Sequence, residues 1–314
     1  MKEIVIAQPL GISKEVLHTL SANLVEKGFH LTSYDSLPKD QKELGNRIEK
    51  ADLAVIANYP LKEEALSYAP SLKYICVAFT GVDHVDIETC KKRNIAVSNC
   101  AGYSTESVAE ITIGMILSLY RKLLEGDAVT RNQKEAGNLQ GIELQGRTLG
   151  LIGTGAIGSR VAELARVFGA KVIGYNRSHN NPSIEYTDLD TLLKTSDIVS
   201  LHLPFTADTK HFINREKLSL MKKEAILINT ARGGVIDNKA LADALNEGKI
   251  AGAAIDVFDM EPPLPLDYPL LHAPHILLTP HVGFNTEEAM KRRAIIVFDN
   301  LESYIEGNQK NIIC

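Results

Sequence analysis

The glycine pattern of the segment GTGAIG, at residues 153–158, constrains the fold most strongly. An apolar run precedes it and a helical pattern begins within it, which is the context that a dinucleotide-binding GxGxxG turn requires. Gly153 permits the tight turn, Gly155 lets the backbone approach a pyrophosphate, and Gly158 allows close packing of helix on strand. Main-chain N–H groups near Ala156 and Ile157, together with the helix dipole, favour bound phosphate. The segment therefore predicts a dinucleotide-binding turn.

Short apolar segments rich in valine and isoleucine alternate with amphipathic segments along the chain. This alternation is typical of βαβ units that build a parallel sheet. The first series has strands at 3–7, 53–57 and 74–78 and helices at 14–27, 63–68 and 87–93. The second series has strands at 148–153, 171–175, 198–203, 225–229, 252–257 and 275–279. Six strands in one series suit a doubly wound dinucleotide-binding sheet.

A chain of 314 residues is longer than one hydrophobic core usually supports. We expect an α/β protein of two doubly wound domains, with a Rossmann dinucleotide-binding domain at 101–284. Residues 1–100 and 285–314 are expected to form a smaller, flavodoxin-like substrate domain. The stretch 104–131 predicts a long helical connection between the domains. A final helix at 286–306 has no strand after it, so we expect it to pack back on the first domain.

The composition narrows the classes of partner. The chain is 45% hydrophobic and 23% charged, with a formal net charge of −5 and no basic stripe, which argues against nucleic acid. The four cysteines form no CxxC pair and are expected to be reduced thiols. The N-terminus enters a strand pattern directly, and the longest apolar helix candidate, 108–120, is too short to span a bilayer. We expect a cytoplasmic protein without a membrane partner or a metal site.

The residues after the second strand of the dinucleotide domain bear on cofactor choice. A carboxylate there usually binds the adenosine ribose, but this chain has Asn176, followed by Arg177 and Ser178. A carboxylate would repel a 2′-phosphate, whereas a guanidinium and a hydroxyl bind one. The pattern leans slightly towards NADP(H). In the alternative, Asn176 serves the ribose of NAD(H) as a neutral partner and Arg177 is a solvated surface residue.

Three predicted strands are each followed by an unusual polar residue, namely Arg232, Glu261 and His281. Ligands of open α/β sheets collect at the carboxyl ends of the strands. Reduction of a ketone needs a group that protonates the developing alkoxide near neutral pH, and histidine is the usual choice. A carboxylate stabilises the protonated imidazole, and an arginine binds a substrate carboxylate in bidentate fashion. The three residues together supply a complete set for this chemistry.

The chain resembles the D-isomer-specific 2-hydroxyacid dehydrogenase family from its first strand to its last helix. The matching segments are GTGAIG at 153–158, HLPFTADT at 202–209, NTARGG at 229–234, DVFDMEP at 256–262 and TPHVG at 279–283. The resemblance implies that His281 is the acid/base, that Glu261 is its hydrogen-bonded partner, and that Arg232 anchors the substrate carboxylate and carbonyl. It also implies that Asp256 binds the nicotinamide carboxamide. Further cofactor contacts are expected at Thr105, Val108, His202, Pro204, Thr209 and Thr230, with His202 in the wall of the adenine pocket.

In the first domain, the segment FTGVD matches the family's substrate loop. The resemblance implies that main-chain N–H groups of Thr80, Gly81 and Val82 cradle the substrate carboxylate. Two positions depart from the family pattern: Phe79, where glycine is frequent, and Asn176, where NAD-dependent members have an acid. The departures leave the substrate pocket and the cofactor open.

We therefore expect an NAD(H)- or NADP(H)-dependent enzyme that transfers a hydride between nicotinamide and a small 2-oxo or 2-hydroxy acid. The segments FTGVDHVD and GYSTESVAE most resemble the glycerate dehydrogenase or hydroxypyruvate reductase branch of the family, so hydroxypyruvate and glyoxylate are the expected substrates. Phosphoglycerate dehydrogenase and D-lactate-type dehydrogenase are alternatives, and a dinucleotide-sensing corepressor-like binding protein is an alternative of another class. The family implies a homodimer formed through the dinucleotide domain.

Overall fold

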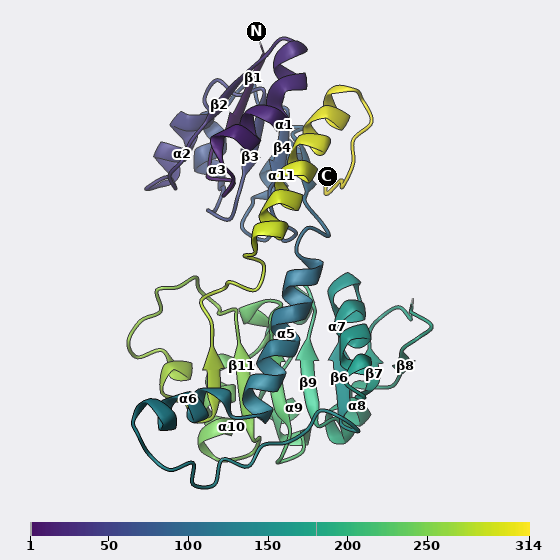
Figure 1. Cartoon of the computed structure of the whole chain (residues 1–314). Coiled ribbons are helices and arrows are strands. Elements are labelled where there is room, and N and C mark those ends of the chain that lie inside the picture. The colour runs from purple at the N-terminus through teal and green to yellow at the C-terminus, as the bar shows by residue number, and fades with distance from the viewer. Residues whose placement is uncertain (1, 180) are drawn as a thin grey trace. The chain divides into compact units, whose positions relative to one another are not determined.

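The computed structural model describes residues 2–179 and 181–314, and the chain divides into two compact units. The substrate unit is the N-terminal part through Ser104 together with Asn285–Cys314, and the dinucleotide unit is Thr105–Phe284. Each unit is an α/β layer structure around its own parallel sheet (Figure 1). The predicted α/β fold class with two doubly wound units is confirmed.

The sheet of the substrate unit has five parallel strands in the order β2-β1-β3-β4-β5. This is the order of flavodoxin-like doubly wound sheets. Its strands are β1 (Lys2–Ile6), β2 (Phe29–Ser33), β3 (Leu53–Ile56), β4 (Tyr74–Val77) and β5 (Ala96–Asn99). Its helices are α1 (Lys14–Glu26), α2 (Gln41–Ile48), α3 (Glu63–Ser67), α4 (Ile87–Lys92) and α11 (Glu287–Ile305).

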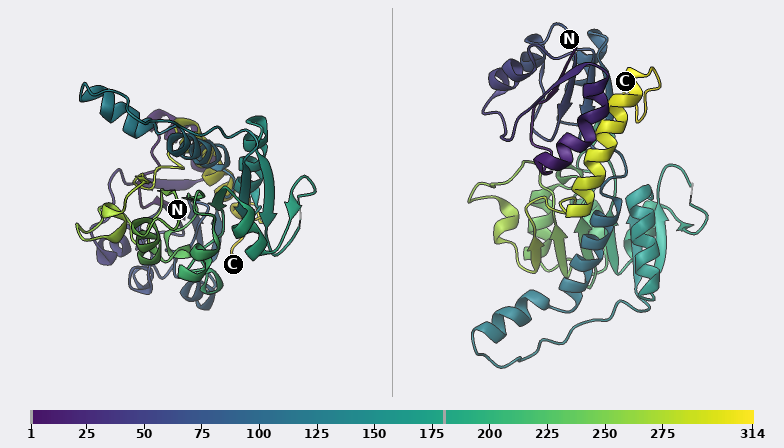
Figure 2. Two further views of the ribbon diagram at one scale, coloured as in Figure 1. Left: turned by 90° about the horizontal axis from the view of Figure 1, so that it is seen from below. Right: turned by 45° about the horizontal axis from the view of Figure 1, so that its top comes forward.

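Helix α11 belongs to the substrate unit although it follows the whole dinucleotide unit in sequence. It begins where the hydroxyl of Thr286 accepts the N–H of Ala289, and it packs against α1 and β4 (Figure 2). The ring of Tyr304 stacks on that of Tyr74 in β4 with the centroids 4.2 Å apart. Burial of this helix therefore joins the last residues of the chain to the first sheet.

The sheet of the dinucleotide unit has seven parallel strands in the order β12-β11-β10-β9-β6-β7-β8. Its strands are β6 (Thr148–Ile152), β7 (Lys171–Tyr175), β8 (Glu185–Tyr186), β9 (Ile198–Leu201), β10 (Ile226–Asn229), β11 (Gly252–Ile255) and β12 (Ile276–Leu278). Its α-helices are α5 (Thr105–Tyr120), α6 (Leu123–Arg131), α7 (Ala156–Val167), α8 (Leu189–Thr195), α9 (Arg215–Leu220) and α10 (Asn238–Asn246). The six predicted strands are present, and β8 is an additional two-residue edge strand.

The predicted long helical stretch over 104–131 is divided into two helices, because α5 ends at Tyr120 and α6 is a separate helix. The carbonyl of Tyr120 accepts the N–H of Ile142 at 2.8 Å, and Lys122 adopts a left-handed backbone with φ +50°. A side-chain-bearing residue in that conformation ends helical geometry. Helix α5 packs beside α7 (Figure 1), whereas α6 has no buried residue and stands away from the sheet (Figure 2).

Each unit has its own apolar core. In the substrate unit, buried side chains of β3 and β4 such as Ile56 and Ile75 pack on α2 and α3. In the dinucleotide unit, one cluster of buried apolar side chains packs α8, α9 and α10 on the sheet, and a second packs α5 and α7 on the sheet. In the described part of the chain, no helix is both long enough and apolar enough to span a membrane.

Candidate active site and dinucleotide pocket

The glycine-rich turn lies between β6 and α7, as its sequence predicts. Gly153 has φ +97°, a conformation that favours glycine. A Cβ at Gly158 would lie 2.2 Å from the carbonyl oxygen of Gly153, so only glycine permits this close approach. Gly155 caps α7 without a side chain, and a Cβ there would meet nothing within 4 Å. The helix therefore opens towards space that fits a phosphate group.

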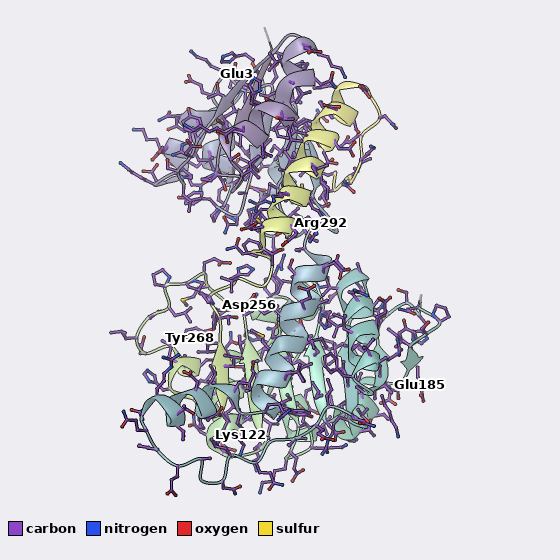
Figure 3. The ribbon with its side chains drawn as sticks, in the orientation of Figure 1. Glu3, Lys122, Glu185, Asp256, Tyr268 and Arg292 are labelled. Atoms are coloured by element: carbon purple, nitrogen blue, oxygen red, sulfur yellow. The ribbon has the colours of Figure 1, made fainter. Side chains whose placement is uncertain are left out.

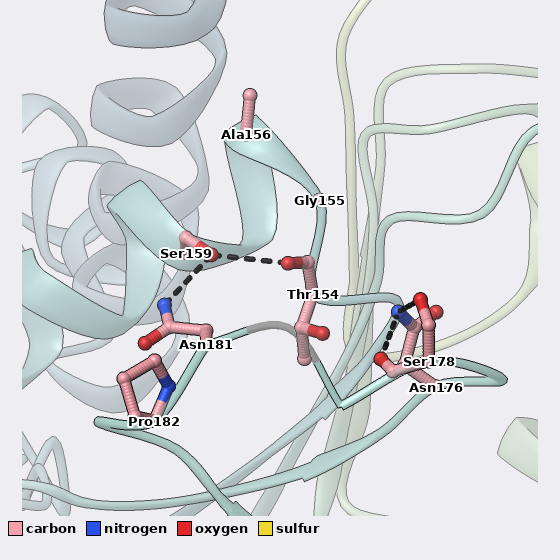
Figure 4. Close-up of a pocket in the computed structure, with 8 residues that line it drawn as sticks. All are labelled: Thr154, Gly155, Ala156, Ser159, Asn176, Ser178, Asn181 and Pro182. Atoms are coloured by element: carbon pink, nitrogen blue, oxygen red, sulfur yellow. Dashed lines mark hydrogen bonds between the residues drawn. The ribbon is translucent and has the colours of Figure 1, made fainter.

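A pocket of about 450 Å³ lies beside this turn (Figure 4). It brings together four residues predicted to bind cofactor with four that the sequence analysis missed, and none of these eight is acidic. They are Gly155, Ala156, Asn176 and Ser178 from the predicted set, and Thr154, Ser159, Asn181 and Pro182. The amide nitrogen of Asn176 donates to the carbonyl of Ser178 at 2.8 Å. Arg177 is exposed next to them.

His202 packs against the glycine-rich turn from the end of β9. A Cβ at Gly158 would lie 3.4 Å from its ring, and its Nε2 lies 2.9 Å from the hydroxyl of Ser200. Burial lowers the pKa of His202 to about 4, so the ring is neutral at physiological pH. Further along, the hydroxyl of Thr209 donates to the carbonyl of Pro204 at 2.7 Å. The backbone of residues 204–209, which follow β9, is thus held by a hydrogen bond within the segment itself.

Arg232 follows β10 in a turn that Asn229 holds in place. The side-chain amide of Asn229 donates to the carbonyl of Arg232 at 3.0 Å and accepts the N–H of Ala231 at 3.1 Å. A Cβ at Gly233 would lie 1.8 Å from the carbonyl carbon of Phe258, which follows β11. This contact requires glycine and fixes the Arg232 turn against the next loop of the sheet.

Asp256 lies directly beyond the carboxyl end of β11 (Figure 3) and is 2% exposed. Its Oδ1 accepts the hydroxyl of Thr279 at 2.6 Å and the N–H of Val282 at 2.9 Å, and its Oδ2 accepts the N–H of Gly283 at 2.9 Å. Charge-assisted bonds of this kind are stronger than bonds between neutral groups. Asp256 therefore holds the loop in which His281 lies. A carboxylate can accept about four hydrogen bonds, and because three are already made here, it can accept one more.

His281 and Glu261 form an ion-pair geometry at the same edge. The Nδ1 atom of His281 lies 3.0 Å from each carboxylate oxygen of Glu261. His281 has φ +55°, a conformation that is rare for residues other than glycine and is concentrated at functional sites. Its ring meets that of Phe284 edge to face at 5.5 Å. The pair lies in the loops after β11 and β12, beside the Arg232 loop after β10, because these strands are neighbours.

The remaining predicted cofactor residues of the dinucleotide unit lie on α5 and after β10. Val108 is buried in the first turn of α5, which begins at Thr105. The hydroxyl of Thr230, directly after β10, lies 2.9 Å from that of buried Thr112 in α5. Ile157, which lies in the first turn of α7, is partly buried against the core of this unit.

The predicted substrate loop follows β4 in the substrate unit. The carbonyl of Thr80 accepts the side-chain amide of Asn99 at 2.7 Å, and the carbonyl of Val82 accepts the N–H of Val85 at 2.9 Å. Within the described part of the chain, Thr80 and Val82 accept hydrogen bonds through their main-chain carbonyls, and the main-chain N–H groups of Thr80, Gly81 and Val82 donate none. The loop is thus fixed by its carbonyls.

Phe79 is half-buried within its own unit. The guanidinium of Arg293 lies 4.8 Å from the centre of the Phe79 ring, and the ring of Tyr103 meets it edge to face at 6.0 Å. A cation over an aromatic face is attracted by the ring's negative charge distribution. The bulky residue at this position therefore has a packing role in the substrate unit.

Some residues missed by the sequence analysis carried a local signal and some did not. Ser159 directly follows the last glycine of the turn and Thr154 lies within it, so their position marks them. Asn181 and Pro182 lie in a loop whose path no motif defines. Phe284 follows His281 by three residues, but only the structure brings the two rings together.

Comparison with known proteins decides the family. Residues 113–283 match the family described as D-isomer specific 2-hydroxyacid dehydrogenase, NAD binding domain. The chain belongs to this family. This D-2-hydroxyacid dehydrogenase is 42% identical to a glyoxylate reductase of Thermofilum pendens over 88% of this chain and 84% of that protein. It is 39% identical to a hydroxypyruvate reductase of Thermotoga maritima over 85% of this chain and 88% of that protein.

A solved structure shows the same fold along the whole D-2-hydroxyacid dehydrogenase chain. An acyclic imino acid reductase in complex with NADPH and D-Arg superimposes with a TM-score of 0.90 and 32% identity, covering 99% of this chain and all of that one. The predictions of the family, of an oxidoreductase acting on CH–OH donors, and of an NAD(H) or NADP(H) cofactor are confirmed.

Proposed function

We propose that this D-2-hydroxyacid dehydrogenase reduces hydroxypyruvate and glyoxylate, with NADP(H) preferred over NAD(H). The observation that carries the proposal is the pairing of His281 Nδ1 with both oxygens of Glu261 at 3.0 Å, on the sheet edge that also carries Arg232. The substrate names come from the relatives of Thermofilum pendens and Thermotoga maritima. A small 2-oxo acid also carries the single carboxylate that one arginine side chain binds in bidentate fashion.

The proton chemistry follows from the orientation of His281. Because Nδ1 faces a carboxylate, it carries a proton and donates to Glu261, and Nε2 is the atom that exchanges a proton with substrate. When bound, the dinucleotide supplies or accepts the hydride at the C2 carbon. In reduction, protonated His281 gives the Nε2 proton to the developing alkoxide oxygen and then regains one from solvent. In oxidation, neutral His281 takes the hydroxyl proton.

We assign substrate binding to Arg232 and to the loop of Thr80, Gly81 and Val82. A guanidinium binds a carboxylate through two parallel N–H bonds and polarises the adjacent carbonyl oxygen. The loop contributes main-chain N–H groups as further donors to the carboxylate. Its carbonyls already accept hydrogen bonds from Asn99 and Val85, which supports an arrangement with the N–H groups available to a ligand.

The cofactor assignment rests on the pocket beside the glycine-rich turn. Gly153, Gly155, Ala156, Ile157 and Gly158 would hold the pyrophosphate, and the spare acceptor position of Asp256 would hold the carboxamide. Thr105, Val108, His202, Pro204, Thr209 and Thr230 would line the remainder. The absence of acidic residues among the described lining residues, with Arg177 exposed beside Asn176 and Ser178, supports the preference for a 2′-phosphate.

A substrate panel tests the reaction. Purified protein is mixed with NADH or NADPH and with hydroxypyruvate, glyoxylate, pyruvate, 3-phosphohydroxypyruvate or a branched 2-oxo acid, and the absorbance of the reduced nicotinamide is followed. We expect the largest kcat/KM with hydroxypyruvate or glyoxylate and NADPH. Absence of oxidation with every acid would contradict an enzymatic role and favour a dinucleotide-sensing protein.

We also propose a cytoplasmic homodimer that associates through the dinucleotide unit. Helix α6 has no buried residue, and its side chains Leu123 and Leu124 are 54% and 55% exposed. Adjacent exposed leucines on a helix that stands away from its sheet support association with a second copy. Sedimentation of the wild type as a dimer, and of Leu123→Asp as a monomer, is expected. The four unpaired cysteines support a reducing compartment.

A further inference from the structure

Tyr186 connects the loop that follows β7 to the glycine-rich turn. Its hydroxyl lies 3.0 Å from the hydroxyl of Thr154 in the turn, and it accepts the main-chain N–H of Asn181 at 3.3 Å. The ring of His179 stacks on the Tyr186 ring with the centroids 4.2 Å apart and the planes within 7°. One side chain therefore contacts both sides of the dinucleotide pocket.

A second link joins the same two segments through Ser159. The hydroxyl of Ser159 donates to the carbonyl of Thr154 at 3.0 Å and accepts the side-chain amide of Asn181 at 2.9 Å (Figure 4). The side-chain oxygen of Asn181, Oδ1, accepts the N–H of Ser183 at 3.0 Å. Asn181 is thus fixed on both of its polar atoms, and it lines the pocket.

The sheet beneath fixes the position of Tyr186 itself. Tyr186 lies in β8, which pairs with β7 so that it is opposite Gly174. A Cβ at Gly174 would lie 2.9 Å from the methyl group of Thr154 and 3.5 Å from the Tyr186 ring. The glycine leaves room for both side chains over the strand. The two-residue strand β8 therefore places the Tyr186 hydroxyl at the turn.

We propose that Tyr186 is a positioning residue for the dinucleotide. It holds Asn181 and Pro182 against the glycine-rich turn, so that the pocket for the adenosine ribose is formed before the dinucleotide binds. A preformed pocket avoids the entropy cost of ordering the loop during binding, and this raises affinity. The proposal rests on the proposed dinucleotide pocket, but it does not depend on the identity of the 2-oxo acid or on the preference for NADP(H).

The test removes one oxygen atom. Tyr186→Phe retains the ring and its stacking on His179 but loses the hydroxyl and both of its hydrogen bonds. We expect the Kd values of NADPH and NADH, measured by nucleotide fluorescence without substrate, to rise about tenfold. The kcat at saturating dinucleotide is expected to stay at the wild-type value, and the thermal unfolding midpoint to fall by only a few degrees, because each lost hydrogen bond contributes about 1 kcal/mol to stability. Tyr304→Phe, which removes a hydroxyl in the substrate unit, is the matched control and should change neither Kd.

A double-mutant cycle isolates the contact between the turn and β8. Thr154→Val removes the other partner of the same hydrogen bond, so the Kd increases of Thr154→Val and Tyr186→Phe should combine to less than their product. An unchanged Kd in Tyr186→Phe would overturn the proposal, as would fully multiplicative effects or an equal loss of kcat at saturating dinucleotide. Because binding is measured without substrate, failure of the substrate panel would leave this result interpretable.

Discussion

The main-chain N–H of His281 donates a 2.8 Å hydrogen bond to the main-chain carbonyl of Asp256. The carboxylate of the same aspartate accepts hydrogen bonds from Val282 and Gly283, the two residues after the histidine. The left-handed conformation of His281 is thus maintained from both sides by one buried residue. The position of the proposed proton donor depends on a residue that need not itself exchange a proton.

Asp256→Asn should therefore lower kcat. An amide nitrogen in place of one carboxylate oxygen would face a main-chain N–H donor, leaving a buried donor without an acceptor and displacing the loop. We expect kcat to fall about 100-fold, the size of effect produced by a displacement of about 1 Å. Steady-state kinetics at saturating substrate and dinucleotide measure it.

Asp197→Asn is the matched control for this change. Asp197 also accepts a main-chain N–H, from Thr148 at 2.9 Å, but it precedes β9, at the amino ends of the strands rather than at the carboxyl ends where Asp256 lies. Its loss should reduce stability and leave kcat near the wild-type value. Equal kcat losses in the two variants would show that Asp256 has no special relation to His281.

Arg177→Ala should weaken NADPH binding selectively. Arg177 is exposed beside the pocket residues Asn176 and Ser178, and a guanidinium there has a partner in NADPH but none in NADH. We expect the Kd of NADPH to rise about tenfold, because the variant loses one charge-assisted hydrogen bond to the 2′-phosphate. The Kd of NADH should change little. An equal loss for both dinucleotides would refute a role in binding the 2′-phosphate.

The stability of the dinucleotide unit should fall in mild acid because of His202. Burial lowers the pKa of His202 to about 4, from an ordinary value of 6.5, so between these values the unfolded chain binds more protons than the folded one. The free energy of unfolding therefore decreases as the pH falls from 6.5 towards 4, by up to about 3 kcal/mol from this residue.

The difference in thermal midpoint between pH 7.5 and pH 5 should be smaller in His202→Gln than in the wild type. His18→Gln, at an exposed histidine of α1, should match the wild type, and identical pH dependence in all three proteins would contradict the assignment.

The sequence predicts the architecture well where local pattern and tertiary environment agree. The buried strands β3 and β4 are continuous apolar runs, and the glycine-rich turn is marked by glycines at the positions where its backbone requires them. The edge strand β2 was missed, because only Phe29 of its five residues is buried and the others, exposed or half-buried, resemble a loop. The end of α5 was missed because the competing hydrogen bond to Tyr120 comes from Ile142, which lies 22 residues further along the chain.

The same distinction applies to the sites. The placement of His281, Glu261 and Arg232 after neighbouring strands could be predicted, because the carboxyl ends of parallel strands meet at one end of the sheet. Tyr186 could not be predicted, because its contacts to Thr154 and Asn181 depend on a two-residue strand that no periodic pattern reveals. Phe79 shows the converse: its departure from the family pattern is visible in the sequence, but its packing against Arg293 is not.

The most direct test of the central claim is the rate at which His281→Gln reduces hydroxypyruvate with NADPH, measured together with its dinucleotide affinity. The variant lacks a group that can protonate the alkoxide, so we expect kcat to fall by a factor of about 100 to 10,000 while the Kd of NADPH stays near wild type. His272→Gln, at an exposed histidine bonded to the carbonyl of Leu266, is the control and should retain full kcat. A His281→Gln enzyme with kcat within a few-fold of the wild type would contradict the assignment of His281 as the proton donor.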